Sequence, residues 1–212
     1  MSPPVKRRAY RSDHRRGLAE QTRARVLDAA AEVFAARGYG KASIAAIAAA
    51  AGVSPETVYA QFGNKRTLLG ELVQHAVRGR DPAPVLKQTG FAEVVAETDQ
   101  RKQLRIFAND IVLRIERAGP LAAIVAEAAR SEPDLAELLE RMRLDRMKNL
   151  RALVDALARN GPLSVSKNEA AETVWALTSP ELHQLLIGAR GWSRKRYTSW
   201  LARSLAELLL RD

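Results

Sequence analysis

The side chains best suited to binding another molecule lie in a short polar stretch between residues 54 and 65. Thr57 and Gln61 are four residues apart, so a helix would place them on the same face. A glutamine can form two hydrogen bonds with the edge of an adenine base, and a threonine can bond to several bases. Tyr59 and Lys65 are of the types that hold phosphate oxygens. The stretch therefore carries the donors and acceptors needed to bind a nucleic acid.

Two short helices are expected to position this stretch. Ser43 can cap the first helix, and Gly52 breaks it. Ser54 followed by Pro55 is typical of a helix start, and the second helix is expected to end near Gly63. The apolar residues that can form a small core between the helices are Ile44, Ile47, Ala48, Val53, Val58 and Phe62. The pattern predicts a helix-turn-helix, a motif whose second helix enters the DNA major groove.

The same residues also have a plainer interpretation, because two helices joined at a glycine occur in ordinary helical bundles. If the motif does bind DNA, Ser54, Pro55 and Thr57 lie at the N-terminus of the second helix, where backbone N–H groups suit phosphate. Glu56 does not suit phosphate. It could accept a hydrogen bond from cytosine, but its position favours a stabilising interaction with the positive end of the helix dipole.

Positive charge is concentrated in the N-terminal part of the chain. The formal net charge is +10, and residues 1–80 hold 14 Lys and Arg against 6 Asp and Glu. This excess suits a polyanion such as nucleic acid, although it could also act only as a solubilising tail. Residues 1–17 show no apolar periodicity and are expected to form a flexible basic arm. Arg7, Arg8 and Arg11 could lie along a DNA minor groove, or the arm could add only non-specific affinity.

Composition excludes several other classes of protein. The chain has 212 residues, of which 47% are hydrophobic and none is cysteine. We therefore expect a globular protein without disulfides or cysteine-bound zinc. His14, His75 and His183 show no metal-ligand spacing, no apolar run is long enough for a membrane helix, and no secretory signal is visible. Nucleotide-binding glycine motifs and Ser/His/acid groups are missing too, so we expect a cytoplasmic protein that is not an enzyme and has no cofactor or metal.

Residues 22–72 resemble the N-terminal domain of the TetR (tetracycline-repressor-like) family of bacterial transcriptional regulators. The matching segments are residues 22–30 (TRARVLDAA), Phe34 with residues 37–39 (RGY), Ile47-Ala48, residues 51–54 (AGVS), residues 57–59 (TVY), Gln61-Phe62, Lys65 and Leu68-Leu69. The sequence departs from the family pattern at two places. Ser43 replaces the usual threonine and should cap equally well, whereas Gln61 replaces a frequent histidine, which affects the base that is read.

The resemblance implies a homodimer in which each subunit has a three-helix DNA-binding module and a larger ligand-sensing and dimerisation domain. It implies that Tyr59 and Lys65 contact the DNA backbone, and that Thr57 and Gln61 contact bases or phosphates. The residues expected at the DNA are therefore Ser43, Ser54, Pro55, Thr57, Tyr59, Gln61 and Lys65, with Arg7, Arg8 and Arg11 of the arm.

The rest of the chain is also expected to be helical, since no segment shows the alternation typical of strands. Two prolines between residues 79 and 84 cannot lie within a helix, and we place a domain boundary there. The chain is then predicted to consist of a basic arm (1–17), a DNA-binding domain (18–80) and a ligand-binding and dimerisation domain (81–212). In the last of these, helices are expected at 90–97, 99–117, 120–130 and 133–160, from 166 with a kink or restart at 179–180, and from 193 to 210. The predicted fold is all-α.

Two sets of residues in this third part are candidates for binding. A sensing pocket would lie between the helices, with ordinary core packing as the alternative, and its candidate residues are Phe107, Ile111, Leu144, Met147 and Trp175. The last helix carries a regular apolar stripe, which could face either a second subunit or its own core. The resemblance favours a dimer interface made of Leu182, Leu186, Tyr197, Trp200, Leu201, Leu205 and Leu208.

Together these features predict a sequence-specific transcriptional regulator. We expect a homodimeric repressor that an unknown small-molecule effector releases from a near-palindromic operator in double-stranded DNA. The alternatives are an activator of the same family and a non-specific architectural protein, which would bind every sequence with a steep dependence on salt. No membrane partner is expected.

Overall fold

The computed structural model describes residues 6–211, and the side chains of residues 17–211. Within these residues the secondary structure is helical, apart from one isolated bridge between Leu163 and Leu210. The predicted all-α class is therefore confirmed. The chain divides into two compact units, the first ending at Leu72 and the second beginning at Val73. No helix in the described part is long and apolar enough to cross a membrane.

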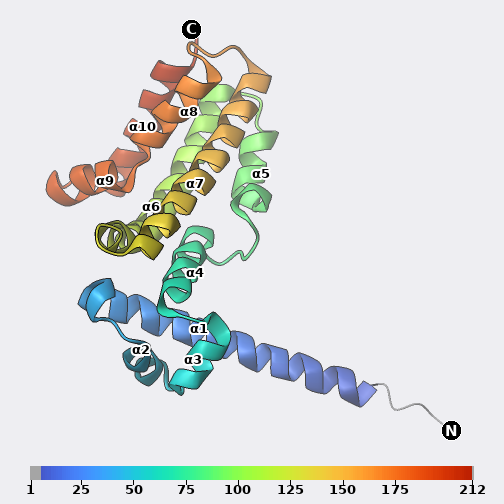
Figure 1. Ribbon diagram of the computed structural model, residues 1–212. Coiled ribbons are helices and arrows are strands. Elements are labelled where there is room, and N and C mark those ends of the chain that lie inside the picture. The colour runs from blue at the N-terminus through green and yellow to red at the C-terminus, as the bar shows by residue number, and fades with distance from the viewer. Residues whose placement is uncertain (1–5, 212) are drawn as a thin grey trace. The chain divides into compact units, whose positions relative to one another are not determined.

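The N-terminal unit consists of α1 (Lys6–Lys41), α2 (Ile44–Ala51), α3 (Pro55–Phe62) and the first half of α4 (Lys65–Arg78). Helices α2 and α3 lie on one side of α1 (Figure 1). The buried apolar side chains of this unit include Val26, Ala30, Phe34, Ile47, Ala48, Val58, Phe62, Leu68 and Leu69. Most of the core predicted for α2 and α3 is thus buried, and Val53 is only half-buried.

Helix α1 begins earlier than the sequence predicts. Residues 6–17 are helical, whereas the sequence predicts a flexible arm without regular structure there, and residues 1–5 lie outside the described part. Lysine, arginine and alanine are good helix formers, which explains why this basic segment can be helical. Gly38 has φ 66° and ψ 176°, which interrupts α1 close to its C-terminus.

The C-terminal unit contains a 3₁₀ turn (Val85–Lys87), α5 (Thr89–Ala96), α6 (Gln100–Ala128), α7 (Pro133–Asn160), α8 (Lys167–Leu177), α9 (Pro180–His183), a π-helical segment (Gln184–Ala189) and α10 (Arg194–Leu209). Helices α6, α7, α8 and α10 pack against one another (Figure 1). The core between them includes Leu104, Phe107, Val112, Leu150, Leu153, Leu157, Val174, Tyr197, Leu201 and Leu205.

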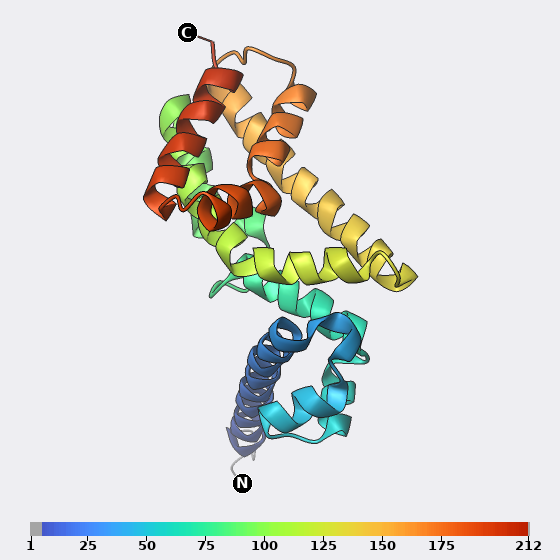
Figure 2. The same cartoon turned by 90° about the vertical axis from the view of Figure 1, so that its left-hand side faces the viewer.

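Helix α6 continues through a glycine–proline pair that was expected to end it. Pro120 lies inside the helix, so the predicted separate helix over 120–130 is wrong. Proline removes one backbone hydrogen bond and its ring crowds the preceding turn, which usually bends a helix rather than ending it when tertiary packing holds both halves. Figure 2 shows that α6 changes direction in this region. The helices predicted over 133–160 and 193–210 agree with α7 and α10.

The buried Tyr197 and the half-buried Arg146 fix the last turn of α8. The Tyr197 hydroxyl donates to the Leu177 carbonyl over 3.1 Å, and Arg146 Nη2 donates to the Trp175 carbonyl over 2.6 Å and to Thr178 Oγ1 over 2.8 Å. Burial raises the pKa of Tyr197 to about 12 and lowers the pKa of Arg146 to about 10. The carbonyls left without partners at the end of α8 are thus satisfied from α7 and α10.

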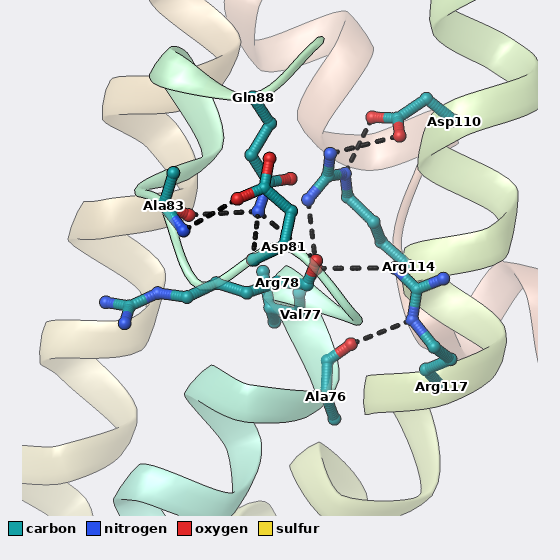
Figure 3. A network of polar contacts seen from close by, with 9 residues as sticks. All are labelled: Ala76, Val77, Arg78, Asp81, Ala83, Gln88, Asp110, Arg114 and Arg117. Atoms are coloured by element: carbon teal, nitrogen blue, oxygen red, sulfur yellow. Dashed lines mark hydrogen bonds and ion pairs between the residues drawn. The ribbon is translucent and has the colours of Figure 1, made fainter. Parts of the chain in front are cut away.

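The boundary between the two units lies earlier than the predicted position after residue 80. Figure 3 shows the reason, because the last residues of α4 bond to side chains of the C-terminal unit. Arg114 donates to the Val77 carbonyl over 2.9 Å, and Arg117 donates to the Ala76 carbonyl over 3.0 Å. Both arginines belong to α6. These contacts join the C-terminal half of α4 to the second unit.

Candidate DNA-binding surface

The turn between α2 and α3 is built around Gly52. This residue has φ 65° and ψ 38°, a left-handed conformation that glycine adopts without steric cost. Its N–H group faces the carbonyls of Ala48 and Ala49, and the Val53 N–H donates to the Ala48 carbonyl over 3.0 Å. The chain can therefore leave α2 and enter α3 within three residues, as a helix-turn-helix requires.

The N-terminus of α3 is capped as the sequence predicts. Ser54 Oγ accepts a hydrogen bond from the Thr57 N–H over 3.3 Å and lies 3.2 Å from the Thr57 hydroxyl, and Pro55 is the first helical residue. The pKa of Glu56 is lowered, first by its own backbone N–H and then by Ser54. The ionised carboxylate is thus held at the positive end of the helix. This favours the interpretation of Glu56 as a stabilising acid of the first turn.

The outer face of α3 is open to solvent. Tyr59 has 53% of its surface exposed, whereas Val58 and Phe62 are buried against the rest of the unit. Ser54 and Ser43 are exposed, and Pro55 and Thr57 are half-buried. Ser43 also caps α2, because its Oγ accepts from the Ala46 N–H over 3.1 Å. The predicted DNA-contacting residues of α2 and α3 therefore belong to two short helices with fixed N-termini.

Gln61 is less exposed than a base-reading residue was expected to be. Its side chain is half-buried, and Oε1 is buried without a hydrogen-bond partner among the described residues. A buried acceptor that makes no hydrogen bond costs about 1–3 kcal/mol. No hydrogen bond to Oε1 therefore holds the Gln61 amide in this orientation. Rotation of the side chain toward an external hydrogen-bond donor, such as a DNA base, would satisfy this oxygen.

Lys65 has an internal role that the sequence did not indicate. Its Nζ donates to the carbonyls of Tyr39 and Ala42 over 2.9 and 3.0 Å and lies 4.1 Å from the centre of the Tyr39 ring. The ammonium group therefore holds the link between α1 and α2. An ammonium has three protons, so one remains for a phosphate oxygen.

Arg23 has a structural role that no sequence pattern predicts. Its guanidinium forms an ion pair with Glu71 and lies 4.5 Å from the centre of the Phe62 ring. It thus joins α1 to both α3 and α4. The partners are 39 and 48 residues away in the sequence, and no local pattern signals such contacts. The side chains of Arg7, Arg8 and Arg11 lie outside the described residues, although their backbone belongs to α1.

The residues predicted to line a sensing pocket do not form one group. Phe107 is buried in the core of the C-terminal unit, and Ile111, Met147 and Trp175 pack against that core. Leu144 has 69% of its surface exposed on α7, so its predicted place inside the bundle is wrong. A helical face continues past the region that neighbouring helices cover, and the sequence pattern alone does not indicate where that cover ends.

The predicted dimer residues fall into two sets. Tyr197, Leu201 and Leu205 are completely buried within their own unit. They cannot contact a second chain, which corrects the prediction for these three. Leu208 is 51% exposed, and the residues that are half-buried are Leu182, Leu186 and Trp200. Leu185, which is not among the predicted residues, is 55% exposed.

Residues 26–72 match the model of a family described as bacterial regulatory proteins of the tetR family. A curated relative, the HTH-type transcriptional repressor BepR of Brucella suis biovar 1 (strain 1330), is 27% identical over 190 residues. The aligned region covers 82% of this chain and 85% of the relative.

Solved structures of regulators share the fold. The fatty acid degradation regulator FadR of Bacillus halodurans has a TM-score of 0.67 at 20% identity, covering 86% of this chain and 93% of its own. NalD of Pseudomonas aeruginosa, the secondary repressor of the MexAB-OprM multidrug efflux pump, has a TM-score of 0.67 at 23% identity, covering 91% and 98%. At these identities the likeness concerns the fold alone.

Proposed function

Because this chain belongs to the TetR family of bacterial regulatory proteins, we propose that it is a homodimeric repressor that reads a near-palindromic operator. The observation that carries this proposal is the capped helix α3, which presents Tyr59 to solvent and Thr57 at its first turn. A helix placed after a tight turn, with an open outer face, can enter a major groove. The protein would act in the cytoplasm, where bacterial DNA is found.

Repression, rather than activation, is supported by the names of similar proteins. BepR is named as a transcriptional repressor, and NalD is described as a repressor of an efflux pump. We extend that sign of regulation to this chain. A small-molecule effector would release the operator by binding one conformation of the dimer more tightly than the other.

The dimer is proposed to form through exposed and half-buried apolar residues that follow α8. These are Leu182, Leu185, Leu186, Trp200 and Leu208. Replacing Leu208 with glutamate is expected to shift the protein from dimer to monomer in sedimentation velocity, because a desolvated charge at an interface core is costly. Leu113→Glu, at a leucine of α6 with 41% exposure, provides the control. A Leu208→Glu protein that still sediments as a dimer would place the interface elsewhere.

The main experiment is selection of the purified protein on random DNA duplexes at near-physiological salt. An enriched inverted repeat would support specific, dimeric binding and would provide the operator sequence. Binding without an enriched motif, but with a steep salt dependence, would contradict the proposal and favour a non-specific architectural protein.

Variants of α3 test which side chains read the sequence. Thr57→Ala and Gln61→Ala are expected to reduce discrimination between the operator and single-base variants by about 1–3 kcal/mol at the base each residue contacts. Fluorescence anisotropy with a set of operator duplexes measures this loss. Thr67→Ala, at an exposed threonine of α4, serves as the matched control. If both α3 variants rank the duplexes as the original protein does, base reading lies with other residues.

A further inference from the structure

A cavity of about 700 Å³ lies in the C-terminal unit, beside the end of α4 and the start of α5. Its volume falls within the range typical of small-molecule sites. The residues lining it are His75, Ala76, Arg78, Gly79, Arg80, Asp81, Gln88, Thr89, Gly90, Asp110, Arg114 and Arg117. Almost all of these are polar, charged or glycine, so the cavity can offer hydrogen bonds and charge to a polar ligand.

The charges around this cavity do not cancel. Four arginines line it, with only two aspartates to oppose them. One of these, Asp110, is already paired with Arg114, through hydrogen bonds of 2.6 Å to Nε and 3.0 Å to Nη2. The Asp81 carboxylate accepts a hydrogen bond from the Ala83 N–H over 2.9 Å. Positive charge is therefore in excess.

The carbonyl groups at the C-terminus of α4 do not offset this excess of positive charge, because side chains donate hydrogen bonds to them. Arg117, Arg114 and Gln88 donate to the carbonyls of residues 76, 77 and 78 respectively, over 3.0, 2.9 and 3.2 Å (Figure 3). Carbonyls at the C-terminus of a helix otherwise attract cations and repel anions. Once they are bonded, they present less negative potential to the cavity.

Two of the arginines, Arg117 and Arg80, have N–H groups that make no hydrogen bond among the described residues. Arg117 bonds only to carbonyls, and its Nη1 makes no hydrogen bond among the described residues. Burial and the neighbouring charge of Arg114 both lower the pKa of Arg117. A bound anion would therefore stabilise the charged guanidinium. Arg80 is exposed and makes no hydrogen bond or ion pair within the described part of the chain. Arg78 projects away from Arg114 and Arg117 in Figure 3.

Two glycines keep the walls of the cavity open. A Cβ atom at Gly79 would lie 3.1 Å from the Arg117 guanidinium, and one at Gly90 would lie 3.2 Å from the Asp110 carboxylate. Gly79 also has φ +70°, a conformation that other residues rarely adopt. Side chains at these positions would press on the charged groups that line the cavity.

We propose that this cavity binds a small, polar dianion, carrying phosphate or two carboxylates, with Arg117 and Arg80 as its main ligands. Arginine suits both groups, because its planar fork matches their paired oxygens. A dianion would balance the excess of two positive charges in the lining. Binding itself is independent of the proposed function. The further step, that this anion is the effector, rests on the proposed function.

The test is calorimetry of the whole chain with inorganic phosphate and with succinate, at constant ionic strength set by sodium chloride. We expect saturable binding of at least one probe and none of glycerol, which is neutral. Arg117→Gln is expected to weaken that binding at least about tenfold. Arg105→Gln, at an exposed arginine of α6 outside the cavity, should leave it unchanged.

Arg117 also supports α4, so its variant could lose binding by losing structure. Arg80→Gln avoids this difficulty, because the exposed Arg80 side chain makes no hydrogen bond or ion pair with the described residues. It is expected to weaken binding about tenfold as well. The proposal is overturned if no anion saturates the protein, or if Arg80→Gln and a folded Arg117→Gln bind as the original protein does.

Titrating the anion into the complex of the protein with its selected operator tests whether anion binding at this cavity regulates DNA binding. Release of DNA by the anion from the original protein, but not from Arg80→Gln, would support the effector role. Saturable binding without any change in DNA affinity would overturn that role and leave the site standing. Anion binding by a protein that selects no DNA motif would contradict the proposed function alone.

Discussion

Replacing Gln88 with alanine is expected to lower the free energy of unfolding of the C-terminal unit by about 3 kcal/mol. The side chain is 4% exposed. Its Nε2 lies 3.2, 2.8 and 2.9 Å from the carbonyls of Arg78, Asp81 and Ala83. One amide thus holds the end of α4 and the whole bend that follows it. Alanine would leave three carbonyls without this donor and would also open a small cavity.

Urea denaturation followed by tryptophan fluorescence measures this effect, because Trp175, Trp192 and Trp200 all belong to the C-terminal unit. Gln88→Glu keeps the length of the side chain but turns the donor into an acceptor. It should therefore destabilise the unit at least as much as alanine does. Gln21→Ala, at an exposed position of α1, should leave the transition unchanged. A Gln88→Ala midpoint equal to that of the original protein would show that these hydrogen bonds contribute nothing to stability.

The ends of most helices could be predicted because the responsible contacts are local. Ser43, Ser54, Ser166 and Ser193 each accept a hydrogen bond from the N–H group three residues later. A cap of this kind depends on residues within one turn, so the sequence pattern contains all of it. The same holds for Gly52, whose left-handed conformation ends α2.

Features that depend on distant residues could not be predicted in the same way. Pro120 breaks an isolated helix, but here α6 continues because α7 and α10 pack along it. The apolar stripe of α10 indicated a buried face but not which neighbour covers it. Tyr197 and Leu201 are consequently buried inside the unit instead of at an interface. Whether a helix continues past a proline, and which neighbour covers its apolar face, depends on the helices that pack against it. The residue pattern within one helix does not specify these neighbours.

On the candidate DNA-binding surface, too, local features could be predicted and contacts between distant residues could not. The cap at Ser54 and the exposure of Tyr59 follow from local sequence. The internal contacts of Lys65 and Arg23 do not, since their partners lie elsewhere in the fold. Residue type alone suggested a phosphate contact for Lys65. The structure adds a second role, which changes what a mutation at this position is expected to do.

Replacing Lys65 with alanine is expected to weaken both the N-terminal unit and its binding to DNA. The ammonium donates to the carbonyls of Tyr39 and Ala42 and lies over the Tyr39 ring. Hydrogen bonds to a charged group contribute about 1.5–3 kcal/mol each, so we expect a loss of about 2 kcal/mol after relaxation. Amide hydrogen exchange should detect it as faster exchange in α2 and α3. Lys41→Ala, at an exposed lysine close by, should leave this exchange unchanged.

The salt dependence of DNA binding distinguishes the two roles of Lys65. If its third proton contacts a phosphate, the slope of log affinity against log salt should fall by about one unit in Lys65→Ala, for operator and random DNA alike. If Lys65 acts only inside the unit, the slope should not change, and affinity should recover at low temperature as the folded fraction recovers. We expect the first result, because the Lys65 ammonium lies at the start of α4 and donates to two carbonyls among the described residues, which leaves one proton for a phosphate oxygen. An unchanged slope in a fully folded variant would remove Lys65 from the DNA contacts.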